Sequence, residues 1–190
     1  MENIKMIEQF FVPDCRSEAL SPPLEDQYKL LDLFRLHDGV PDSVRSYMNS
    51  VVTLWLYGWL HYPFYPIAIF LSTTAVEMAL QERFPERRRE GLKKLLQTAK
   101  NAGLISDDGF PSLVERRETA AILSESSTSG IEVSPMQRPQ KLYVDEIIES
   151  LPKVRNRFAH PKGEQILPPG MAVDSLVVTS EIINQLWPRN

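Results

Sequence analysis

The chain has 190 residues, of which 43% are hydrophobic and 24% are charged. This length is enough for one domain that buries roughly 70% of its unfolded surface. The formal charge of −4 and the isoelectric point near 5.5 argue against a surface that is basic throughout for nucleic-acid binding. The single cysteine, Cys15, excludes an intrachain disulfide and a cysteine-based metal site, as is typical of the reducing cytosol. The opening residues lack a basic segment followed by a long apolar core, so we expect a cytoplasmic protein without a signal peptide.

The sequence predicts an all-α chain in a compact bundle of about five to seven helices, because its apolar residues recur with helical period. Residues 1–20 are expected to be an N-terminal extension. Residues 21–190 are expected to form one helical domain with a mobile Ser- and Pro-rich loop at 124–140. Gly103 is the expected residue after the end of the fourth helix. The predicted helices span 25–36, 42–62, 65–84, 86–102, 111–123, 142–159 and 171–186.

The most apolar stretch, residues 51–70, resembles a membrane span in composition, but Pro63 and Pro66 interrupt it. A bilayer requires about 20 consecutive apolar residues. We therefore interpret the stretch as parts of two helices that meet at a corner, and we expect no membrane partner. Both helices are apolar around most of their circumference, so each must lie centrally in the bundle or be covered by a partner chain.

The segment "ERFPERRREGLKK" concentrates basic residues that allow two interpretations. The first is a solvated helix face in which neighbouring glutamates balance the positive charge. The second is a local nucleic-acid contact, which an acidic protein would need in place of an overall basic surface. The basic residues are Arg83, Arg87, Arg88, Arg89, Lys93 and Lys94, and the glutamates are Glu82, Glu86 and Glu90.

The stretch "LPKVRNRFAHP" places Arg155 close to the apolar face of a predicted helix, about 20° from Ile148 at 100° per residue. A guanidinium on that face needs an anionic partner. Glu77 of an earlier helix could supply it, or a bound phosphate could. Pro152 removes one backbone donor and is expected to kink the helix before Arg155. The apolar stripe consists of Val144, Ile147, Ile148, Leu151, Val154 and Phe158.

His160 stands directly before Pro161, which disfavours helical backbone at the preceding residue, so the helix should end there. "RNRFAH" then resembles the Arg-x4-His motif of the HEPN superfamily, with a polar residue directly after the arginine. "YPIAIFLSTTAVEMALQERF", with its acidic Glu77, and "GLKKLLQTAKNAGLI" are similar to earlier helices of that family. The likeness covers roughly residues 54–187, and only the short motif is specific.

The resemblance implies a compact all-α bundle with metal-independent endoribonuclease activity, as in toxins and defence effectors, and a motif at a dimer interface. By resemblance, Arg155 and His160 are the catalytic pair and Asn156 orients them. Lys153, Arg157 and Glu77 are the expected substrate contacts. No metal or cofactor is expected. The implied partners are RNA, a second copy of the chain, and a nucleotidyltransferase-like antitoxin as a further candidate.

These residue types suit the chemistry, since histidine transfers protons near neutral pH and arginine holds two phosphate oxygens at once. A homodimer is also expected because Arg155 and His160 lie roughly 140° apart on an ideal helix, so that a two-fold axis could unite both motifs. The apolar residues Trp55, Trp59, Tyr62 and Phe64 suggest a covered surface.

Two alternatives remain open. A non-catalytic HEPN-like dimerisation or nucleotide/RNA-binding module is favoured by the acidic isoelectric point. An unrelated helical scaffold would explain Arg155 by a simple pair with an acid.

Overall fold

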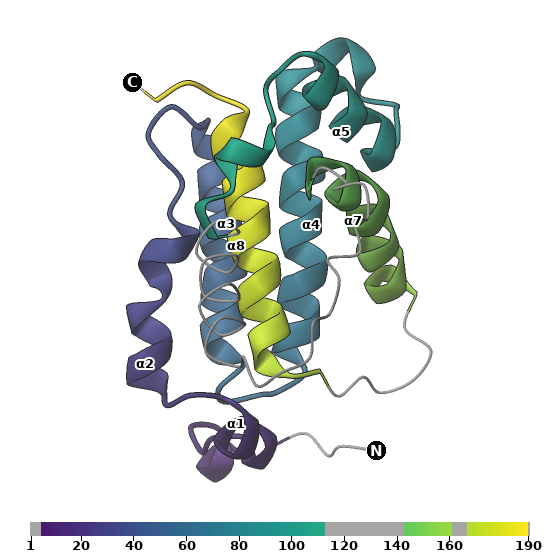
Figure 1. The fold of residues 1–190 in the computed structure, drawn as a ribbon. Helices are drawn as coiled ribbons and strands as arrows, with labels where there is room; N and C mark the ends of the chain where they lie inside the picture. Colours follow the sequence, from purple (N-terminus) through teal and green to yellow (C-terminus); the bar gives the residue numbers. More distant parts are fainter. Residues whose placement is uncertain (1–4, 113–142, 161–166, 190) are drawn as a thin grey trace, which may run out of the picture.

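The structure is a computed structural model that describes residues 5–112, 143–160 and 167–189. Within these ranges the chain forms α-helices and short 3₁₀ helices and contains no strand (Figure 1). The predicted all-α class is therefore confirmed, whereas the predicted loop at 124–140 and nearly all of the predicted helix 111–123 lie outside the described residues. The α-helices are α1 (Cys15–Leu20), α2 (Leu24–Lys29), α3 (Asp42–Tyr57), α4 (Phe64–Arg83), α5 (Leu92–Asn101), α7 (Tyr143–Ala159) and α8 (Pro169–Gln185). The 3₁₀ helices are η1 (Ile7–Gln9), η2 (Leu31–Phe34), η3 (Pro85–Arg87) and η4 (Asp107–Gly109).

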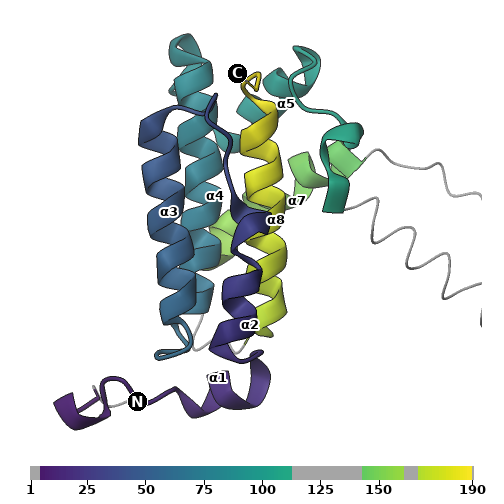
Figure 2. The same ribbon diagram turned by 90° about the vertical axis from the view of Figure 1, so that its left-hand side faces the viewer.

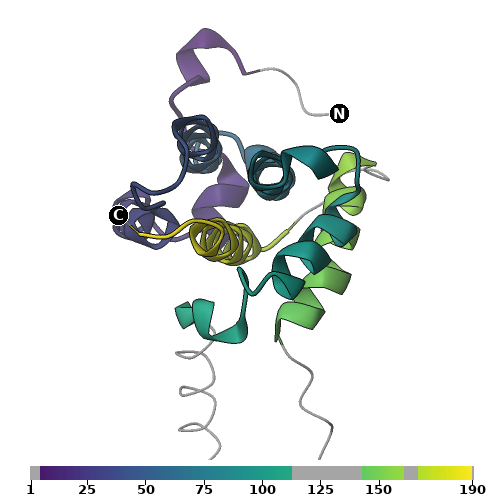
Figure 3. The same cartoon turned by 90° about the horizontal axis from the view of Figure 1, so that it is seen from above.

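Helix α4 is the centre of the bundle and packs against α3, α8, α7 and α5 (Figures 1 and 3). Its buried residues include small side chains such as Ala68, Ala75 and Ala79, which let neighbouring helices approach on several sides. The buried Ser72 hydroxyl is satisfied by the Ile69 carbonyl at 2.9 Å and lies 3.1 Å from the Ser175 hydroxyl of α8. Because α4 is covered by four other helices, most of its circumference is apolar.

By length and composition alone, α4 is the one helix in the described part of the chain that could cross a membrane. Half of its most apolar segment is buried in the bundle. The central helix of a globular bundle meets the same criterion, so this property of α4 gives little support to a membrane-spanning role.

Several helix boundaries differ from the predicted ones. The helix predicted at 42–62 ends at Tyr57, and residues 58–63 form the turn into α4. The helix predicted at 86–102 begins only at Leu92, because Gly91 has extended backbone and separates it from η3. Gly103 has a positive φ of 68°, and Leu104 donates to the Ala99 carbonyl at 2.9 Å, so the predicted glycine cap is confirmed.

The turn between α3 and α4 is covered by residues of the predicted N-terminal extension, which lie across one end of the bundle (Figure 2). The Asp14 amide donates to the Trp59 carbonyl at 3.1 Å, and the Ser17 hydroxyl donates to the Gly58 carbonyl at 2.8 Å. Asp14 also caps α1 by accepting a bond from the Arg16 amide.

The chain itself covers part of the aromatic surface that suggested a dimer. Trp55 and Tyr62 are each 1% exposed. Trp55 packs edge to face on Phe34 of η2 with ring centres 5.1 Å apart, and the Tyr62 hydroxyl donates to the Leu167 carbonyl. The residues of η2 and those before α8 thus bury two of the four aromatic side chains within one chain.

Candidate functional site

Helix α7 carries the Arg-x4-His motif and packs against both α4 and α5. Val144, Ile147, Ile148 and Leu151 are buried, as the apolar stripe predicts. The helix remains helical across Pro152 and ends at Ala159, where the His160 amide makes the last helical bond to the Asn156 carbonyl at 3.1 Å. The predicted helix end before Pro161 is therefore confirmed.

Arg155 lies at the edge of the buried stripe and pairs with Glu77 on α4. Its Nη2 atom is 3.3 Å from Oε2 of Glu77, and the two side chains are 37% and 19% exposed. The Nε atom is buried and has no hydrogen-bond partner in the described residues. The ion pair with Glu77, one of the alternatives left open for Arg155 and the one that an unrelated helical scaffold would also contain, is thus present. It leaves part of the guanidinium facing solvent.

A groove with a volume of about 410 Å³ opens beside this ion pair. One wall is α7, which contributes Pro152, Arg155 and Asn156, with Glu77 of α4 beside them. The Asn156 amide oxygen lies 3.5 Å from Nη1 of Arg155, at the limit of a hydrogen bond. The opposite wall comes from the turn before α5 and its first residues, Arg89, Glu90, Gly91, Leu92, Lys93 and Lys94.

The groove carries more positive than negative charge. Glu77 pairs with Arg155, Lys93 lies 2.6 Å from Glu149, and Glu90 lies 3.5 Å from Arg87. Arg89 and Lys94 are exposed, and in the described ranges neither makes an ion pair. An anion that enters the groove therefore meets two cations that are not already neutralised.

The structure brings only some of the predicted residues together. Glu77, Arg155 and Asn156 line the groove, whereas Lys153, Arg157 and His160 are exposed and do not. His160 stands at the end of α7, one turn beyond Asn156, and its imidazole has no partner among residues 5–112, 143–160 and 167–189.

Arg89 and Lys94 were not predicted as site residues, although both belong to the basic run noted in the sequence. The signal was ambiguous because the same run contains balancing glutamates. Only the packing of α5 against α7 places these two cations opposite Arg155.

In the described parts of the chain, no three His, Cys, Asp or Glu side chains gather as metal ligands do. The sequence matches no family model, and comparisons with curated proteins and with solved structures give no significant match.

Proposed function

We propose that this chain is a metal-independent endoribonuclease of the HEPN type that acts as a toxin or defence effector. The observation that carries the proposal is the groove between α5 and α7, in which Arg155 and Asn156 of the motif face two unneutralised cations, Arg89 and Lys94. The all-α bundle agrees with the fold that the resemblance implies.

In this proposal the groove binds the RNA backbone. The guanidinium of Arg155, held by Glu77, donates to the oxygens of the scissile phosphate and stabilises the charge that develops on them. His160 accepts the proton of the 2′-hydroxyl. The 2′-oxygen bonds to phosphorus, the bond to the 5′-oxygen breaks, and a protonated imidazole donates to that oxygen. The products are a 2′,3′-cyclic phosphate and a 5′-hydroxyl.

His160 does not line the groove of its own chain, and the proposal therefore includes a homodimer. A two-fold axis near the ends of two α7 helices would bring the His160 of one chain to the Arg155 groove of the other, and would supply two histidines for the two proton transfers.

The test is cleavage of single-stranded RNA by the purified protein and by Arg155→Ala. We expect at least about 100-fold slower cleavage by the variant, as for the loss of a charge-stabilising group. Lys29→Ala, which changes a well-exposed lysine on α2, is the matched control and should cleave like the parent. Equal rates for Arg155→Ala and the parent would refute the assignment.

A second candidate function is a non-catalytic RNA- or nucleotide-binding module. Two observations favour it: Glu77 already neutralises Arg155, and His160 lies outside the groove. Such a module would bind RNA without cutting it. Arg89→Ala and Lys94→Ala would each weaken binding and flatten its salt dependence by about one unit of slope.

A further inference from the structure

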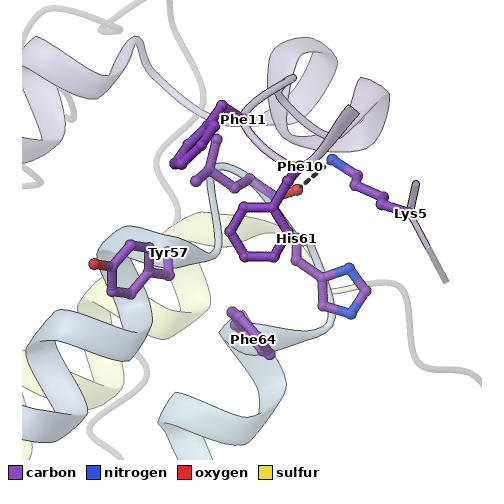
Figure 4. Close-up of a pocket in the computed structure, with 7 residues that line it drawn as sticks. Lys5, Phe10, Phe11, Tyr57, His61 and Phe64 are labelled. Atoms are coloured by element: carbon purple, nitrogen blue, oxygen red, sulfur yellow. Dashed lines mark hydrogen bonds between the residues drawn. The ribbon is translucent and has the colours of Figure 1, made fainter. Parts of the chain in front are cut away.

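An aromatic pocket at the opposite end of α4 from η3 lies outside the groove. Its volume is about 480 Å³, within the range of about 300–1,000 Å³ typical of small-molecule sites. It forms where the N-terminal segment meets the turn between α3 and α4, and Figure 4 shows its aromatic rings gathered around a common space. The lining residues are Lys5, Phe10, Phe11, Tyr57, Leu60, His61 and Phe64.

The lining is apolar on most sides and remains open to solvent. Phe10, Phe11 and Tyr57 are 58%, 80% and 53% exposed. Soluble proteins rarely expose several large aromatic side chains at one place, because this leaves a contiguous apolar surface in contact with water. The His61 imidazole stands edge to face on Phe64 with ring centres 4.9 Å apart. An elongated apolar ligand would cover these rings and gain the free energy of their removal from water.

The positive charge of Lys5 at the pocket favours a ligand whose polar end is an anion. The Lys5 ammonium donates to the carbonyl oxygens of Val12 and Leu60, each at 2.6 Å, which fixes it at the rim. Figure 4 shows the second of these bonds as a dashed line. Neither carbonyl carries a net charge, and Lys5 makes no ion pair within the described ranges. Among the described residues, no carboxylate lines the pocket. Two of the three N–H groups of the ammonium are used by these carbonyls, so one N–H is left for a ligand anion.

We propose that this pocket binds a free single-chain carboxylate of the fatty-acid class, with its carboxylate at Lys5 and its chain among Phe10, Phe11, Tyr57 and Phe64. Because Lys5 joins the N-terminal segment to the turn between α3 and α4, the bound ligand bridges the same two parts of the chain. The proposal does not depend on ribonuclease activity.

The experiment is isothermal titration of the full chain with dodecanoate below its micelle concentration. The same titration with dodecyltrimethylammonium tests whether the pocket prefers a negative head group. Titration with decanoate tests how much the length of the alkyl chain contributes to binding. We expect saturable binding of dodecanoate with one ligand per chain, weaker binding of decanoate by up to about 15-fold for two methylenes, and binding of the cationic surfactant at least about 10-fold weaker than dodecanoate.

Variants locate the ligand. Lys5→Gln should weaken dodecanoate binding at least about 10-fold, while Lys29→Gln, at an exposed lysine on α2, should leave it unchanged. Phe11→Ser changes a side chain that is 80% exposed, so the bundle should fold normally, and it should weaken binding of both carboxylates. Ile67→Ala, at an exposed position of α4 that does not line the pocket, should not.

Three results would overturn the proposal. The first is no saturable binding of dodecanoate. The second is equal binding of the two head groups, or equal loss in Lys5→Gln and Lys29→Gln. The third is binding to anionic phospholipid vesicles, or self-association through this surface, without any binding of the free carboxylate.

Discussion

Asp14 fixes the N-terminal segment to the bundle, and Asp14→Asn tests how strongly. Asp14 is 8% exposed. It accepts bonds from Nε and Nη2 of Arg16 at 3.0 and 2.9 Å, from the Arg16 amide at 3.0 Å, and from the Tyr62 amide at 3.1 Å. The Arg16 side chain, followed by the two backbone amides and the Arg16 charge, lowers the pKa of Asp14 from 3.8 to about 2, although burial opposes this.

The free energy follows from that difference in pKa. At 1.36 kcal/mol per pH unit, the ionised carboxylate contributes about 2 kcal/mol to the free energy of unfolding at pH 7. Because the folded-state pKa is depressed, this contribution is complete above about pH 5 and disappears as the pH falls toward 2. About 1 kcal/mol of it should remain at pH 3.

The assay is urea denaturation of the parent and of Asp14→Asn at pH 7 and at pH 3. Circular dichroism monitors the unfolding. We expect the variant to be less stable by about 2 kcal/mol at pH 7 and by about half as much at pH 3. Asp26→Asn, whose carboxylate is 49% exposed and pairs with Lys29, should change stability by less than about 0.5 kcal/mol. Equal stability of Asp14→Asn and the parent at pH 7, or a difference independent of pH, would refute the reasoning.

Three further predictions concern packing, chemistry and assembly. Gly58→Ala should lower the free energy of unfolding by about 1–3 kcal/mol, because a Cβ there would lie 2.6 Å from the buried Tyr65 ring. Gly170→Ala, in the first turn of α8, meets nothing within 4 Å and should not lower stability in the same urea titration. RNA cleavage should persist in excess chelator and leave cyclic phosphate ends on mass spectrometry of the products; activity that is lost on chelation and restored by one metal would contradict this. Mixed Arg155→Ala and His160→Ala subunits should regain activity if the site is composite, and a fully active monomer by light scattering would exclude the dimer.

The sequence predicted the helical class and the buried face of α7 because both follow from local periodicity. The four most buried positions of that stripe lie at the helical spacing that was recognised. The sequence pattern placed the end of α3 at residue 62 instead of Tyr57, because residues 58–62 are apolar enough to continue a helix. Beyond Tyr57 the turn makes tertiary hydrogen bonds, with the Gly58 carbonyl accepting from Ser17 and the Tyr62 amide donating to Asp14, and the sequence pattern does not show these bonds.

The candidate site was predictable only in part. Arg155 was singled out because a charged residue on an apolar face needs a partner, and Glu77 was named as that partner. Arg89 and Lys94 could not be assigned, since their place opposite Arg155 depends on how α5 packs on α7. The separation of His160 from the groove also follows from helix geometry, as the predicted angle of roughly 140° indicated.

The most direct test of the central claim is the single-turnover rate of RNA cleavage by His160→Ala compared with the parent in the presence of excess chelator. His160 is exposed and its imidazole makes no hydrogen bond or ion pair with the described residues, so its removal should leave thermal stability nearly unchanged. The account predicts cleavage by the parent and a rate at least about 100-fold lower for the variant. An equal rate for the two proteins, or no cleavage by the parent protein, would contradict it.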